Sequence, residues 1–153
     1  MIRHLRPFVS LALGALLVAG CDRSILSPGE VAGTYVLERV NASPLPAVIT
    51  DTEFTTVTLL ADTLRLNDDS TGSEVRVQHY VAHPNGTTPT RETLSLFVRY
   101  EPRHGGIRLG YACSIDGNSL CLSVVPVEIT AELTSTGLVM HIESNDWHFR
   151  RIG

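Results

Sequence analysis

The clearest absence from this sequence of 153 residues is lysine, since all twelve basic residues are arginines. Chemistry that needs a lysine amine, such as Schiff-base formation or the lysine contact of a P-loop, is therefore excluded. Sixteen acidic residues outnumber the arginines. A basic face for binding phosphates is not expected, so the sequence predicts no nucleic-acid partner.

Recognisable catalytic and metal-binding motifs are also missing. The sequence contains neither a Gly-x-Ser-x-Gly elbow nor a His-Glu-x-x-His pair, the signatures of common hydrolases and zinc peptidases. Pro84 is expected to end its strand before His79 and His83 can share a face, and Asp68-Asp69 fits a hairpin turn better than a calcium site. We therefore expect a protein that is not an enzyme and holds neither metal nor cofactor.

Long hydrophobic runs are absent too, apart from one near the start. Arg3 and Arg6 precede an apolar run from residue 8 to residue 20 that only Ser10 interrupts. A membrane-spanning helix needs about 20 apolar residues, so this run is too short and is typical of a cleaved export signal over residues 1–20. Without that segment, ten arginines face sixteen acidic residues, a net charge of about −6.

The run ends in Leu17-Val18-Ala19-Gly20-Cys21, which resembles the lipobox of bacterial lipoproteins. The resemblance implies that diacylglycerol is attached to the Cys21 thiol and that acyl chains hold the protein on the inner or outer membrane of a bacterial envelope. The domain would then lie in the periplasm. Residues 21–30, rich in serine, proline and glycine, are expected to form a flexible tether.

Cysteine is scarce, with three in the whole chain. If Cys21 is acylated, Cys113 and Cys121 remain, and two cysteines eight residues apart in an oxidising compartment most simply form a disulfide. A redox-active pair usually has the closer Cys-x-x-Cys spacing, so a structural disulfide is the preferred interpretation.

The rest of the chain, residues 31–153, shows the period-two alternation of β-strands. Apolar residues alternate with polar ones in short runs that turn signals separate, among them Asn85-Gly86, Gly105-Gly106 and Asp116-Gly117. About eight or nine strands are expected, as an antiparallel meander. Closing it into a barrel removes exposed edges, and a two-sheet β-sandwich is the alternative.

The layout resembles that of lipocalin-like small bacterial lipoproteins. Gly33-Thr34-Tyr35 stands where lipocalins carry Gly-x-Trp, a long loop follows, and Trp147 with Arg150 lies near the end. The resemblance implies a barrel that binds a small hydrophobic molecule or a lipid.

Three residues are candidates for contacts with such a ligand. His79 lies on the apolar face of the run Val75, Val77, His79, and that face is expected to point inward with Tyr100 and Tyr111. Core side chains with satisfied hydrogen bonds remain the simpler interpretation of all three. The alternative function is a structural or interaction module that contacts an envelope protein through the two longer loops, residues 41–53 and 82–93.

Overall fold

The computed structural model describes residues 25–84, 88–113 and 128–153, which form one antiparallel β-structure with a single short helix. The elements, in chain order, are α1 (Pro28–Val31), β1 (Gly33–Val40), β2 (Ser43–Pro44), β3 (Ala47–Asp51), β4 (Thr55–Leu66), β5 (Thr71–Ala82), β6 (Thr90–Arg103), β7 (Gly106–Cys113), β8 (Glu128–Leu133), β9 (Gly137–Ile142) and β10 (Asn145–Arg151).

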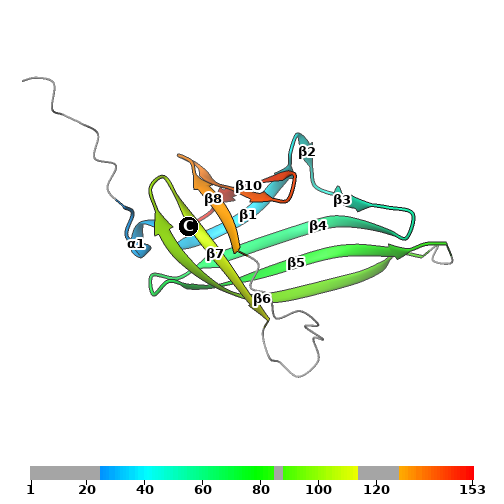
Figure 1. Ribbon diagram of the computed structural model, residues 1–153, viewed down its shortest axis with the longest axis horizontal. Helices are drawn as coiled ribbons and strands as arrows, with labels where there is room; N and C mark the ends of the chain where they lie inside the picture. The colour runs from blue at the N-terminus through cyan, green and yellow to red at the C-terminus, as the bar shows by residue number, and fades with distance from the viewer. Residues whose placement is uncertain (1–24, 85–87, 114–127) are drawn as a thin grey trace, which may run out of the picture.

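Eight of these strands close into a barrel (Figure 1). Strands β4 to β10 pair in chain order, and β1 closes the circle because it pairs with both β10 and β4. The short strands β2 and β3 flank this closure, β2 on β1 and β3 on β4. The predicted all-β meander that closes into a barrel is confirmed, whereas the sandwich alternative is not.

A β-bulge in β4 decides which of its residues face inward. The sequence predicts two separate strands around Val57-Leu59 and Leu64-Leu66, but the chain forms one strand of 12 residues. Its pairing with β5 shifts register between Leu59 and Ala61. One extra residue reverses the alternation, so Leu59 before the bulge and Asp62 after it are both buried.

The barrel interior holds one continuous apolar core. Most of its members are aliphatic residues that alternate along the barrel strands, and Leu109 on β7 and Met140 on β9 are fully buried, as the alternation predicts. The largest fully buried apolar side chains are Tyr35, Leu59, Leu64, Ile107, Leu109, Leu138 and Met140.

Helix α1 covers one end of this core. The Glu30 carboxylate accepts hydrogen bonds from the backbone N–H (2.6 Å) and the hydroxyl (2.8 Å) of Ser27, a capping arrangement that orders the turn. Val31 is buried completely, and the Tyr35 hydroxyl donates to its carbonyl oxygen. The expected tether therefore ends before Pro28, because residues 28–30 belong to this helix.

The start and the end of the barrel chain meet at the same place. Tyr35 pairs in register with Arg151, whose guanidinium lies 5.9 Å from the centre of the tyrosine ring. A Cβ atom at Gly33 would lie 2.8 Å from both the Gly153 carbonyl oxygen and Arg151 Nε, so only glycine allows this approach. Arg151 thus packs on Tyr35, while the neighbouring Arg150 points outward to Glu38 at 2.5 Å.

The orientation of β5 differs from the sequence expectation. We expected Val75, Val77 and His79 to face inward, but Val75 is 42% exposed and Glu74 is fully buried. The pairing of β5 with β6 is regular from residue 71 to residue 80, so His79 shares the outer face with Val75. The inner face carries Glu74 and Arg76 instead, and the expectation for His79 was wrong in its direction.

Candidate functional site

Charged residues from neighbouring strands meet inside the barrel. Asp62 on β4 lies directly opposite Arg76 on β5, and Glu74 stands two residues before Arg76 on the same face. Trp147 on β10 lies against Arg76, and Tyr111 on β7 is close enough for the charge of Glu74 to act on it. We refer to Asp62, Glu74, Arg76, Tyr111 and Trp147 as the interior cluster.

Arg76 links the members of the interior cluster. Its Nε donates to Asp62 Oδ2 at 3.0 Å, a terminal nitrogen donates to Glu74 Oε1, and its guanidinium lies 4.5 Å from the centre of the Trp147 ring. The carboxylate side chains of Asp62 and Glu74 are 0% exposed, whereas that of Arg76 is 17% exposed. Of Asp62, Glu74 and Arg76, only Arg76 is therefore in contact with solvent.

Three buried polar atoms of the interior cluster have no hydrogen-bond partner. They are Asp62 Oδ1, Glu74 Oε2 and Trp147 Nε1, and they make up all such side-chain atoms found in the described part of the chain. Leaving a buried polar atom unpaired costs about 1–3 kcal/mol, and more for a charged group. Such atoms gather where a proton, a water molecule or a ligand supplies the missing bond.

Burial makes one carboxyl group of the cluster hard to ionise. Burial, and next the charge of Glu74, raise the pKa of Asp62 to about 9, although Arg76 opposes this shift. At neutral pH Asp62 therefore keeps its proton, and Glu74 with Arg76 forms a neutral ion pair. The Tyr111 hydroxyl lies 3.7 Å from Met140 Sδ, and burial and the charge of Glu74 raise its pKa as well.

The inner face changes from closed to open along β6. Tyr100 and Val98 are buried, Leu96 is half-buried, and Leu94, which lies opposite Arg76, is 37% exposed. Strands β4, β5 and β6 continue past this level to the right in Figure 1. The interior cluster thus lies between the core that α1 covers and the exposed end of the inner face.

The three predicted ligand contacts do not come together. Tyr111 belongs to the interior cluster, whereas Tyr100 lies at the α1 end, its hydroxyl 3.1 Å from the Pro28 carbonyl oxygen and also bonded to that of Asn67. His79 is on the outer face. The sequence signal missed Asp62, Glu74 and Arg76 because charged residues at inward positions cannot be told from outward ones by alternation alone.

The cysteine predictions fall largely outside the described residues. Cys21 and Cys121 are not among them, and of Cys113 only the backbone, at the end of β7, is described. Acylation of Cys21 and a disulfide between Cys113 and Cys121 therefore stay predictions.

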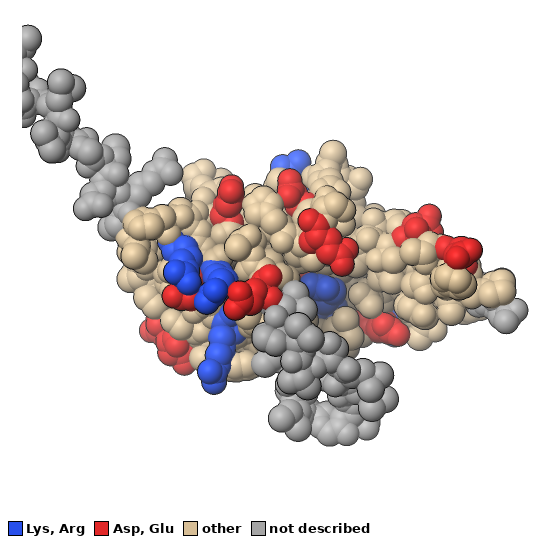
Figure 2. All heavy atoms as spheres, viewed as in Figure 1, with Lys and Arg blue, Asp and Glu red and all other residues tan. Residues whose placement is uncertain are grey.

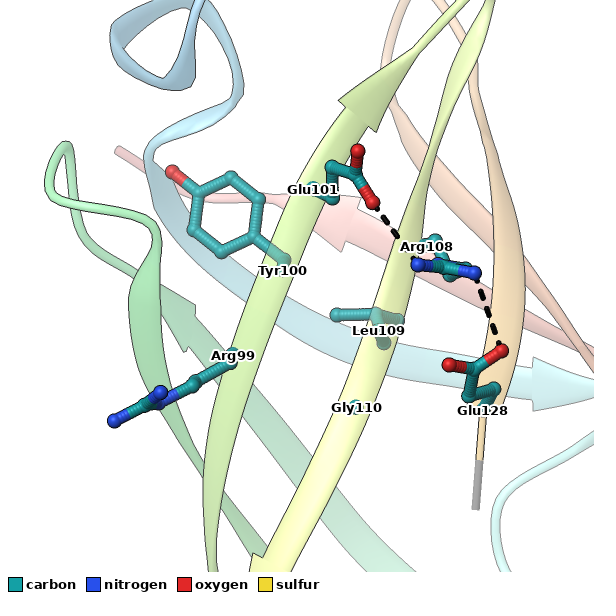
Figure 3. A pocket seen from close by; sticks show the side chains of 7 residues that line it. All are labelled: Arg99, Tyr100, Glu101, Arg108, Leu109, Gly110 and Glu128. Carbon is teal, nitrogen blue, oxygen red and sulfur yellow. Dashed lines mark hydrogen bonds and ion pairs between the residues drawn. The ribbon is translucent and has the colours of Figure 1, made fainter. Parts of the chain in front are cut away.

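A second feature is a hollow of about 190 Å³ on the outer face of β6, β7 and β8 (Figure 3). Gly110 leaves it free of a side chain, while Tyr100 and Leu109 point away from it, into the barrel. Arg108 bridges Glu101 (3.1 Å) and Glu128 (3.3 Å) across it. These charges satisfy one another in water and are about half exposed, so the hollow offers little binding energy.

A third feature is a wider hollow of about 370 Å³ next to the turn between β6 and β7. His141 lies at its edge, with Nδ1 2.8 Å from Asp146 Oδ1 and Nε2 3.8 Å from Glu132. Neither hollow is lined by any of the unpartnered buried atoms found in the described residues. The interior cluster is therefore the stronger candidate site.

Comparison with known proteins returned no matching family model, no matching curated protein and no matching solved structure. Within residues 25–84, 88–113 and 128–153, no helix is long and apolar enough to cross a membrane. The same residues contain no group of three or more His, Cys, Asp or Glu side chains placed to hold a metal ion. Function must be argued from the geometry of the interior cluster.

Proposed function

We propose that this protein is a lipoprotein of the bacterial cell envelope, anchored through an acylated Cys21, whose barrel binds a small amphipathic molecule. The observation that carries the binding proposal is the group of three unpartnered polar atoms, Asp62 Oδ1, Glu74 Oε2 and Trp147 Nε1, inside an otherwise apolar core. No catalytic step is part of the proposal.

Both halves of an amphipathic molecule find partners on the inner face. The polar group of the ligand would form hydrogen bonds with the unpartnered atoms of the interior cluster. Its apolar part would cover Leu96 and Leu94, which follow one another along β6 toward the open end. Each buried methylene would contribute about 0.8 kcal/mol, so a chain of about ten carbons would supply the roughly 8 kcal/mol of micromolar binding, before the cost of ordering the ligand.

Ligand binding is tested by native mass spectrometry of the protein purified in mild detergent from its own membranes. Extra mass beyond the acylated chain, released by organic extraction, is the expected result. The matched variant is Leu94→Glu, which places a charge on the exposed inner face without touching the core and should abolish retention. Identical masses before and after extraction would contradict the binding proposal.

The anchor is tested separately. We expect the wild-type protein in the membrane fraction and a Cys21→Ser variant outside it, because acyl chains hold a domain on a bilayer without help from the fold. Intact mass should show the added acyl groups on the wild type alone. Membrane attachment of the serine variant would contradict the lipoprotein proposal and leave ligand binding open.

A second candidate function is an interaction module, and one observation favours it. The His83 backbone N–H donates to the carbonyl oxygen of Phe54, the residue after the first long loop (2.7 Å), and His83 Nε2 lies 3.0 Å from Thr56 Oγ1. Phe54 is 67% exposed, and Val48 on β3 is 58% exposed. Exposed apolar residues mark a protein contact where they form one contiguous patch.

This alternative is tested by photo-crosslinking in cells from positions 48 and 54, with position 128 on β8 as the control site. A discrete adduct from the loop positions alone would support an envelope protein partner. Equal, diffuse labelling from all three positions would count against it.

A further inference from the structure

The charges that face the barrel interior are mostly negative. By register, Glu92 on β6 lies opposite Gln78 and accepts a hydrogen bond from it at 3.1 Å, on the same face as Glu74 and Arg76. With Asp62, the inner face from the interior cluster to the open end thus carries three carboxyl groups and one arginine among the residues described, whereas Arg151 lies at the α1 end. An organic anion entering this interior would meet net repulsion.

The hydrogen-bonding pattern of the interior cluster also favours a cation over an anion. Arg76 donates to both carboxylates and its guanidinium lies over the Trp147 ring, so its positive charge is already compensated inside the barrel. Asp62 Oδ1 and Glu74 Oε2 are both acceptors when ionised, and both lack a donor. With both carboxyl groups ionised, the cluster would lack one positive charge that carries N–H groups.

One face of the molecule carries acidic side chains around the open end. In Figure 2 acidic side chains are visible over the far ends of β3 to β6, on the right, and no arginine is visible there on that face. Arginines gather instead on the left, among the acidic residues over β6 to β8. On this face a positively charged molecule would be attracted toward the open end, whereas Arg91 lies on the outer face of β6 near the same end.

We propose that the ligand is an amphipathic amine, whose ammonium group binds between Asp62 Oδ1 and Glu74 Oε2 and whose apolar part lies along Leu96 and Leu94. This inference rests on the proposed ligand-binding function and names the chemical class of the ligand. The ammonium N–H groups would supply the missing donors, and its charge would be paired with the second carboxylate.

Binding of a cation must release a proton. Without ligand, Asp62 stays protonated, and this limits the charge repulsion between the two buried carboxyl groups. When the ammonium enters as a cation, Asp62 ionises and its proton passes to solvent. The net charge inside the barrel stays the same when the ammonium replaces the proton, so no additional charge has to be buried.

Trp147 provides a direct signal, because it is the only tryptophan of the chain and belongs to the interior cluster. The detergent-solubilised full-length protein is titrated at pH 7 with decylamine, decan-1-ol and sodium decanoate, each below its micelle concentration. These probes share a chain and differ in the charge of the head group. We expect decylamine to bind at least tenfold more tightly than decanol, and decanoate to bind most weakly.

Two variants and one control locate the head group. Asp62→Asn and Glu74→Gln keep shape and hydrogen bonding but remove a carboxylate, so each should weaken decylamine binding about tenfold or more while decanol binding stays unchanged. Glu101→Gln, in the outer ion pairs, should leave all three affinities unchanged. Calorimetry in two buffers of different ionisation enthalpy should show about one proton released per decylamine by the wild type and none by Asp62→Asn.

The outcomes separate the two proposals. Decanol or decanoate binding as tightly as decylamine, or an Asp62→Asn variant with full amine affinity, would overturn the amine inference and leave ligand binding standing. Failure of all three probes to change Trp147 fluorescence would overturn both.

Discussion

The raised pKa of Asp62 makes the stability of this protein depend on pH in a direction opposite to that of most acidic residues. In the unfolded chain its pKa is near the ordinary value of 3.8, whereas in the barrel it is about 9. Between these values the folded state binds a proton that the unfolded state has lost. The stability that this proton provides is complete below about pH 4 and declines as the pH rises toward 9.

The magnitude follows from one proton. The free energy of unfolding should fall by about 1.4 kcal/mol per pH unit, which amounts to about 3 kcal/mol between pH 5 and pH 7. The groups that face Asp62 are Glu74, Arg76 and Tyr111, and the pKa of Tyr111 is raised further above its ordinary value of 10.0, outside this window. A loss of this size is a large part of the 5–15 kcal/mol that stabilises a typical domain.

The test compares the wild type with Asp62→Asn, which resembles the protonated acid and has no proton to lose. Urea unfolding followed by Trp147 fluorescence at pH 5, 6, 7 and 8 gives both stability curves. The difference between them should grow in favour of Asp62→Asn by about 1.4 kcal/mol per pH unit, because all other groups cancel. Glu101→Gln, at a half-exposed site, should follow the wild type.

Parallel curves for the wild type and Asp62→Asn from pH 5 to pH 8 would refute this reasoning. They would mean that Asp62 is already ionised at pH 5, with Arg76 outweighing the cost of burial. The proton release expected on amine binding would then be lost as well.

Two further predictions concern the barrel itself. Tyr100→Phe removes the hydroxyl that joins the carbonyl groups of Asn67 and Pro28 at the α1 end. In urea titrations this change should lower the free energy of unfolding by about 1–2 kcal/mol. The control Tyr80→Phe, on the exposed end of β5, should lower it less. Gly137→Ala would place a Cβ atom 1.9 Å from the Phe149 carbonyl oxygen, which would force β9 and β10 apart and lower the free energy of unfolding by about 1–3 kcal/mol. Gly29→Ala, with open space around it, should leave that free energy unchanged or raise it. Equal unfolding midpoints for the two alanine variants would contradict the packing argument.

Local patterns in the sequence predicted much of the barrel. Alternation along residues 94–100, 107–111 and 138–142 identified strands β6, β7 and β9 and their inner faces, because an apolar inner face and a polar outer face are encoded residue by residue. Helix α1 was not predicted, because the serine, proline and glycine content of residues 21–30 favoured a tether.

What the sequence determined by itself is the all-β class, the antiparallel order of strands and the shortage of positive charge. The tertiary structure decided which face of β5 turns inward, where β4 bulges, and that Asp62, Glu74 and Arg76 are buried together. The physical reason is that burial of a charge becomes acceptable only when a partner from another strand arrives, and such a partner is invisible to any local pattern.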